Sequence, residues 1–217
     1  MENKVVIDNA EKSNMAHIHK TDMNKISIYS IVKRFIDVFA SLIGIVLLSP
    51  IFIIVSILIK TESKGPIIFR QLRAGINSKP FYIYKFRSMR INAPNISTNE
   101  FVDSSSYITR VGRFIRKTSI DELPQLFNII KGDMSIVGPR PVILREEELI
   151  QSRAEYGVDK ILPGITGLAQ INGRDKISLV DKVKYDKEYL EIRSIKIDAY
   201  IMWITVLKVL KGSDTKE

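Results

Sequence analysis

Two adjacent carboxylates, Asp121 and Glu122, lie within a basic stretch of this 217-residue chain. The cations on either side of the pair are Arg113, Arg116, Lys117, Lys131 and Arg140. This pattern suits a magnesium-dependent reaction on a diphosphate, because one carboxylate can bind the ion, the other can react, and the cations can neutralise phosphate. An aspartate is ionised at neutral pH, so as a nucleophile it needs no general base.

The same residues also fit an ordinary helix start. Ser119 and Glu122 have the spacing of a capping box, and acidic residues are favoured near a helix N-terminus. Pro124 suits the first turn of a helix, and Gly132 suits the residue that ends it. Spacing alone leaves the catalytic and the capping interpretations open.

Longer motifs favour the catalytic interpretation. The stretch RKTSIDELPQLFNIIKGDMSIVGPRP, residues 116–141, resembles the signature of the bacterial sugar transferases, the small monotopic polyprenyl-phosphate phosphoglycosyl transferases. Further similar stretches are KRFIDVFASLIGIVLLSP, GPIIFRQLRAG, YKFRSM, LPGITGLAQINGR and YDKEYL, so the resemblance covers about residues 33–212. It implies transfer of a sugar-1-phosphate from a UDP-sugar to undecaprenyl phosphate with release of UMP, the first membrane step of exopolysaccharide, capsule, O-antigen or glycoprotein glycan synthesis.

The resemblance also implies roles for individual residues. We expect Asp121 to attack the β-phosphorus of the UDP-sugar in a ping-pong mechanism, which forms an aspartyl phospho-sugar that the acceptor phosphate then attacks. Glu122 is the expected ligand of Mg²⁺, the expected cofactor. The expected phosphate- and substrate-binding residues are Arg116, Arg140, Lys85, Arg87, Asp186 and Arg174. For Asp186, a surface ion pair with Lys182 is the alternative.

Residues 35–59 are almost continuously apolar, and a straight helix of this length would span a bilayer core of about 30 Å. Pro50 follows Ser49 near the middle, where proline removes a backbone hydrogen bond and kinks a helix; the Ser49 hydroxyl is one candidate donor to the freed carbonyl. Lys33 and Arg34 precede the stretch and further cations follow it, whereas a spanning helix concentrates cations at its cytoplasmic end. These features leave a spanning and a re-entrant helix open, and the family resemblance favours the re-entrant form.

The remaining sequence completes a fold that is α/β but mostly α, and membrane-associated. We expect a loose polar tail over residues 1–30, a re-entrant membrane helix over 31–60, and a cytosolic catalytic core over 61–212. Within this core, residues 67–90 predict a small β-hairpin with its turn over 74–80. The apolar residues 197–210 are too short to span and predict an interfacial amphipathic helix, with packing against the core as the alternative.

The formal net charge of +9 suits anionic partners such as lipid head groups and nucleotides. The expected partners are a UDP-sugar donor, undecaprenyl phosphate and membrane lipids, and a homodimer is among the oligomeric states the sequence allows. Cations are dispersed without a base-reading module, so we expect no nucleic-acid partner. The resemblance implies a monotopic protein of the bacterial inner membrane with its active site on the cytoplasmic face. Competing hypotheses are a non-catalytic basic membrane protein and a phosphohydrolase that uses the same carboxylate.

Overall fold

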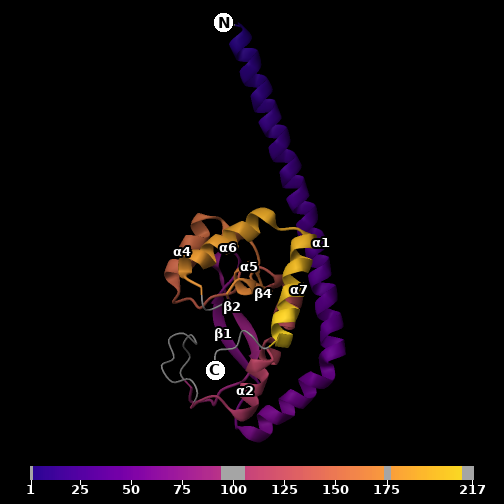
Figure 1. Cartoon of the computed structure of the whole chain (residues 1–217), viewed down its shortest axis with the longest axis vertical. Helices are drawn as coiled ribbons and strands as arrows, with labels where there is room; N and C mark the ends of the chain where they lie inside the picture. Colours follow the sequence, from indigo (N-terminus) through magenta and orange to yellow (C-terminus); the bar gives the residue numbers. More distant parts are fainter. Residues whose placement is uncertain (1, 94–105, 174–176, 212–217) are drawn as a thin grey trace. The chain divides into compact units, whose positions relative to one another are not determined.

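The computed structural model describes residues 2–93, 106–173 and 177–211, with side chains from residue 28 onwards. The chain forms two units, Met1–Ile36 and Asp37–Glu217, and helix α1 (Glu2–Glu62) begins in the first and ends in the second (Figure 1). The sequence predicts a loose tail up to residue 30, whereas the structure continues α1 through residues 2–30. No Gly or Pro interrupts residues 2–43, so nothing in this segment breaks a helix.

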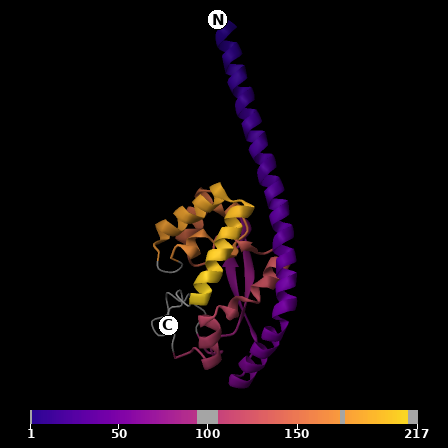
Figure 2. The same cartoon turned by 45° about the vertical axis from the view of Figure 1, so that its right-hand side comes forward.

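From Asp37 onwards, α1 combines an exposed apolar surface with a few anchoring contacts. Ile28–Glu62 is long and apolar enough to cross a membrane by length and composition, and Phe39, Val46 and Leu47 are among its exposed side chains. The helix continues through Pro50, and its last part bends (Figures 1 and 2). The Ser49 hydroxyl donates to the Val46 carbonyl at 2.8 Å, which is the acceptor that a residue other than proline would have used. The predicted compensation by Ser49 is confirmed.

A β-hairpin follows α1, as the sequence predicts. Strands β1 (Ile68–Ala74) and β2 (Pro80–Phe86) pair antiparallel, with Ile68 opposite Phe86 and Ala74 opposite Pro80. Asn77 has a φ of 52°, the left-handed conformation that asparagine tolerates in tight turns. Phe86 packs with Val55 and Ile59 of α1, so the hairpin is fastened to the last turns of that helix.

The middle of the chain is a series of short elements stacked on the hairpin. They are α2 (Arg110–Lys117), the 3₁₀ turn η2 (Ile120–Glu122), α3 (Gln125–Lys131) and strand β3 (Ser135–Val137). Ile129 and Met134 are fully buried against Ile83 of β2. Gly132 ends α3 with a φ of 99°, so its predicted role as the helix stop is confirmed.

The last part of the chain is mainly helical. Its elements are α4 (Glu147–Glu155), η3 (Val158–Lys160), β4 (Gly164–Thr166), α5 (Leu168–Ile171), α6 (Leu179–Ile192) and α7 (Ile195–Lys211). Strand β4 lies parallel to β3, with Ser135 opposite Gly164. Helix α7 buries Ile201 completely and leaves Trp203 62% exposed. One face of α7 therefore packs on the core, as the alternative prediction has it, and another face presents apolar side chains; its position at a membrane interface stays a prediction.

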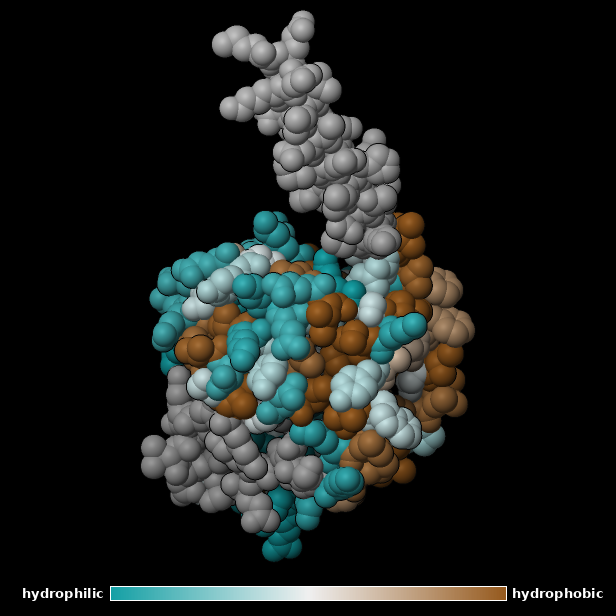
Figure 3. All heavy atoms as spheres, turned by 45° about the horizontal axis from the view of Figure 1, so that its top comes forward, coloured by the Kyte–Doolittle hydropathy of each residue, from teal (hydrophilic) through white to brown (hydrophobic). Residues whose placement is uncertain are grey.

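Apolar side chains also gather on the surface where α1 runs (Figure 3). Within α1 they include Leu42, Ile43, Ile53, Ile54 and Ile57, which are all exposed. A contiguous exposed apolar surface of this kind is typical of a membrane or protein contact rather than of a face in water. The described fold is thus mostly helical with two small sheets, and its long apolar helix is compatible with membrane association.

Candidate active site

Asp121 and Glu122 lie in η2, immediately before Pro124 and α3. Both side chains are buried, with 9% and 8% of their surface exposed. The capping-box interpretation is wrong, because the Ser119 side chain makes no cap hydrogen bond and its N–H donates to the Arg116 carbonyl at 3.1 Å. Ser119 instead adopts a left-handed φ of 57°, and the Glu122 carboxylate contacts cations from distant parts of the chain.

Two cations contact the same oxygen of Glu122. Lys85 Nζ of β2 lies 2.8 Å from Glu122 Oε1, and Arg140 Nη2 lies 3.3 Å from it. Arg116, at the end of α2, is close enough for its charge to act on Asp121. Of the predicted site residues, the structure therefore brings together the two carboxylates with Lys85, Arg116 and Arg140. Three cations face two carboxylates, which leaves a positive balance for an incoming phosphate.

The pKa of Asp121 is raised above its ordinary value, and burial is the main cause. The positive charge of Lys85 lowers it, the neighbouring Glu122 carboxylate raises it, and Arg116 and Arg140 lower it further. A carboxylate with a raised pKa binds a proton more tightly than an exposed one. By the same property it is a stronger nucleophile once it is ionised.

Arg140 belongs to the GPRP turn that follows β3, and its backbone is held from two sides. Gly138 N–H donates to the Thr166 carbonyl at 2.8 Å, and Gly164 N–H donates to the Pro139 carbonyl at 2.9 Å. A Cβ at position 138 would collide with the Leu162 carbonyl, so only glycine permits this close approach. The turn thus holds the Arg140 guanidinium beside Glu122.

Arg153 of α4 supplies a further support that the sequence prediction missed. Its guanidinium donates to Asp186 Oδ2 of α6 at 2.9 Å and 2.6 Å, and to the Arg140 carbonyl at 2.9 Å. Asp186 is only 1% exposed, so the alternative of a surface pair with Lys182 is wrong. Burial raises the pKa of Asp186, against the opposing effect of the Arg153 charge and hydrogen bonds. A signal was present in the sequence, since Arg153 follows the apolar Leu149 by four residues and so shares its buried helix face.

Arg87 lies in a different environment from Lys85. It is 6% exposed, and its guanidinium donates to the carbonyls of Lys64 at 2.8 Å and Ser63 at 2.7 Å, and to the Ser63 hydroxyl at 2.9 Å. These carbonyls follow the C-terminus of α1, where a cation is favoured by the helix dipole. The structure therefore shows Arg87 bound to the segment that follows α1, and its predicted contact with substrate stays a prediction. Arg174, the remaining predicted site residue, lies outside the described residues.

In the part of the chain that the structure describes, the candidate protein ligands for Mg²⁺ are the two carboxylates of η2. Among the described residues, no group of three or more His, Cys, Asp or Glu side chains could hold a metal ion. Mg²⁺ is commonly held by one or two carboxylates together with substrate phosphate oxygens, and keeps several waters. Asp121 and Glu122 fit that pattern when a diphosphate supplies the other ligands.

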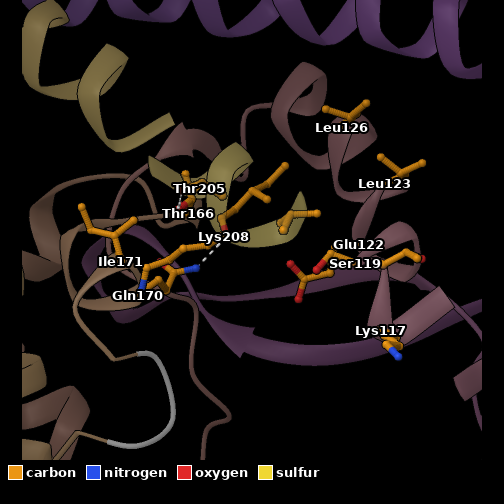
Figure 4. Close-up of a pocket in the computed structure, with 13 residues that line it drawn as sticks. Lys117, Ser119, Glu122, Leu123, Leu126, Thr166, Gln170, Ile171, Thr205 and Lys208 are labelled. Carbon is orange, nitrogen blue, oxygen red and sulfur yellow. Dashed lines mark hydrogen bonds between the residues drawn. The ribbon is translucent and has the colours of Figure 1, made fainter. Parts of the chain in front are cut away.

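A cavity of about 270 Å³ lies beside Glu122 (Figure 4). Its wall comes from η2, α3, β4, α5 and α7, and includes Leu123, Leu126 and Ile171. The buried Glu122 carboxylate therefore borders a hollow large enough to hold part of a ligand.

Comparison with known proteins identifies the family. Residues 28–212 match the sequence profile described as bacterial sugar transferase, which is most of the chain. The chain belongs to the bacterial sugar transferase family. This family assignment confirms the resemblance that the sequence motifs indicate.

Several named sugar transferases are similar to this family member. A UDP-glucose:undecaprenyl-phosphate glucose-1-phosphate transferase of Klebsiella pneumoniae is 40% identical over 185 residues, 82% of this chain and 40% of that protein. A UDP-N-acetylgalactosamine-undecaprenyl-phosphate N-acetylgalactosaminephosphotransferase of Aeromonas hydrophila is 36% identical, over 90% of this chain and 48% of its own. The exopolysaccharide production protein ExoY of Sinorhizobium fredii is 38% identical, over 81% of this chain and 84% of its own length. The chain thus spans less than half of the first two relatives and most of the third.

Proposed function

We propose that this sugar transferase moves a sugar-1-phosphate from a UDP-sugar to undecaprenyl phosphate and releases UMP. The observation that carries the proposal is the buried Asp121–Glu122 pair, whose Glu122 is contacted by Lys85 and Arg140. Similarity to proteins named for UDP-sugars and undecaprenyl phosphate supports both substrates.

In the first half of the proposed reaction, an oxygen of Asp121 attacks the β-phosphorus of the UDP-sugar. A bond forms between that oxygen and phosphorus, and the bond from the β-phosphorus to the bridging oxygen breaks, so UMP leaves with the electron pair. The product is an aspartyl phospho-sugar. The raised pKa of Asp121 supports this step, because a more basic carboxylate is the better nucleophile.

In the second half, an oxygen of the acceptor phosphate attacks the same phosphorus. The bond to Asp121 breaks, the carboxylate is regenerated, and the sugar leaves as a polyprenyl diphosphate-linked product. A covalent intermediate lets a soluble donor and a membrane-bound acceptor use one site in turn. Lys85, Arg116 and Arg140 offset the charge on the phosphoryl oxygens during both steps.

Mg²⁺ is the cofactor that this site would take. Glu122, with Asp121 beside it, would hold the ion, which would neutralise diphosphate oxygens and assist departure of UMP. Lys85 and Arg140 already contact Glu122, so they hold its carboxylate in a fixed orientation. Glu122→Gln is expected to alter the dependence of turnover on Mg²⁺ concentration. An unchanged Mg²⁺ titration curve would show that Glu122 is not a ligand of the ion.

The location that fits this reaction is the cytoplasmic face of the bacterial inner membrane, with α1 entering and leaving from that face. The bend of α1 and the Ser49–Val46 hydrogen bond support a re-entrant helix. The chain has no Cys, so Ser30→Cys and Thr61→Cys provide single labelling sites without further changes. Labelling of both from the cytoplasmic side alone is expected, and labelling from opposite sides would establish a spanning helix.

The reaction is tested by UMP release from a panel of UDP-sugars, by the full chain in nanodiscs with Mg²⁺, with and without undecaprenyl phosphate. We expect acceptor-dependent UMP from at least one sugar, and its loss in Asp121→Asn. Asp181→Asn is the matched control, because Asp181 is exposed and lies outside the site. Normal turnover by Asp121→Asn would show that Asp121 is not the nucleophile. UMP release at the same rate without acceptor would indicate a hydrolase.

A further inference from the structure

The cavity beside Glu122 has walls made mainly of hydrocarbon. Its apolar lining residues are Leu123, Leu126, Ile165, Ile171 and Val209. Figure 4 shows Leu123 and Leu126 above Glu122, with Thr205 and Lys208 of α7 to their left. The cavity therefore joins an apolar hollow to Glu122, the neighbour of Asp121 in η2.

The wall also holds polar side chains, which include Lys117, Lys208 and two threonines. The Thr166 and Thr205 hydroxyls lie 2.7 Å apart, and Gln170 Nε2 donates to the Ile165 carbonyl at 2.6 Å. Gln170 Oε1 is buried without a hydrogen-bond partner among the described residues, and an added Cβ at Gly167 would lie 2.9 Å from it. No aromatic side chain is among the described lining residues, so the wall offers a nucleobase no aromatic stacking surface.

The cavity lies next to two helices with exposed apolar side chains, α1 and α7. Leu126 packs against α1 at Gly44, where an added Cβ would lie 3.3 Å from Leu126 Cδ1. Val209 comes from α7, which also leaves Leu210 78% exposed. A hydrocarbon chain that leaves the cavity along either element would meet further apolar surface.

We propose that this cavity binds the first isoprene units of the acceptor's polyprenyl chain. The inference rests on the proposed function, because it identifies the cavity with one of that reaction's two substrates. A prenyl chain suits an apolar cavity of about 270 Å³, which has room for a few isoprene units and not for the whole chain. With the chain in the cavity, its phosphate lies at the Glu122 end, close to Lys85 and Arg140.

The kinetic test narrows the cavity with Val209→Phe and uses Val206→Phe as the matched control. Val206 is on the same helix and exposed, and it does not line the cavity. We expect Val209→Phe to raise the KM for farnesyl phosphate on the order of tenfold, the scale on which a small change in a hydrophobic pocket discriminates ligands, and Val206→Phe to leave it unchanged. An unaltered acceptor KM in Val209→Phe would overturn the proposal.

The donor half-reaction separates the two substrates. A single-turnover burst of UMP, measured without acceptor, reports the UDP-sugar side alone. In Val209→Phe, we expect the KM for the acceptor to rise while the size of this UMP burst changes far less. An equal loss in both would assign the cavity to the donor and overturn the inference.

A photo-cross-linking experiment gives a readout that needs no turnover, so its failure differs from failure of the reaction. The probe is farnesyl phosphate with a diazirine in its first isoprene unit, presented in vesicles to the full chain. Adducts are expected on Leu123, Leu126 and Val209, with competition by unlabelled farnesyl phosphate. Adducts confined to the exposed surface of α1, or protection of the cavity by uridine, would overturn the inference.

Discussion

Replacing Arg153 by Met should destabilise the protein strongly, although Arg153 does not contact Asp121 or Glu122 in any described hydrogen bond. The change removes two hydrogen bonds to Asp186, at 2.9 Å and 2.6 Å, and one to the Arg140 carbonyl at 2.9 Å. Asp186 is 1% exposed, so its carboxylate would lose its main cation while still buried. Breaking a buried pair in this way costs about 3–5 kcal/mol. For a chain of this size, that corresponds to a melting temperature lower by about 6–20 °C.

The assay is thermal unfolding of detergent-held protein, followed by intrinsic fluorescence. Without Arg153, the folded-state pKa of Asp186 rises further, so the destabilisation is expected to be largest at high pH and to shrink as pH falls and Asp186 takes up a proton. The double variant Arg153→Met/Asp186→Leu should recover much of the loss, since no charge is left buried. Arg145→Met is the matched control, because Arg145 is exposed just before α4.

Activity separates stability from positioning. The double variant still lacks the hydrogen bond from Arg153 to the Arg140 carbonyl, so its kcat should stay low even when its melting temperature recovers. A double variant as unstable as the single one would refute the buried-pair argument. Wild-type kcat in the stable double variant would refute the claim that Arg153 positions Arg140.

Three further substitutions test other parts of the structure. Asp121→Asn should abolish turnover yet melt no lower than wild type at pH 7. The raised pKa of Asp121 means that its ionised, buried carboxylate destabilises the wild-type fold at pH 7 and that this cost is relieved as pH falls toward the ordinary pKa of an aspartate, whereas the neutral Asn side chain carries no such cost. A clearly lower melting temperature of the variant at pH 7 would contradict the burial argument. Arg87→Met should lower the melting temperature while the KM for UDP-sugar stays constant. A raised KM with an unchanged melting temperature would indicate that Arg87 binds the substrate. Gly112→Ala should reduce the yield of folded protein in a solubility and melting assay, because its Cβ would overlap the Ser88 carbonyl; normal melting would show that α2 can shift.

Local features of the fold were predictable because their causes lie close together in sequence. The hairpin follows from two apolar strands with Gly75 and Asn77 between them, and the end of α3 follows from Gly132. Ser49 donates to the carbonyl that Pro50 leaves without its backbone donor, and that carbonyl, of Val46, is only three residues away. Family motifs added the Asp121–Glu122 pair, whose own spacing fitted a helix cap equally well.

The contacts of individual cations were harder to predict. Lys85 and Arg87 are two residues apart, yet Lys85 contacts Glu122 and Arg87 contacts the C-terminal end of α1. The alternation of β2 does not explain this difference, because two residues apart on a strand share a face. The strand ends at Phe86, so Arg87 is beyond it, and the path of the chain around α1 decides where its guanidinium goes.

The sequence by itself determined the family, the apolar helix, the hairpin and the adjacent carboxylates, because each depends on neighbouring residues or on contiguous motifs. Only the tertiary structure decided which cations meet Glu122, that Arg153 holds Asp186 and the Arg140 backbone, and that an apolar cavity ends at Glu122. The contacts of Glu122 and Arg153 join residues separated by 13 to 37 positions along the chain. Their geometry arises from the packing of helices and strands against one another, which no local pattern of residues encodes.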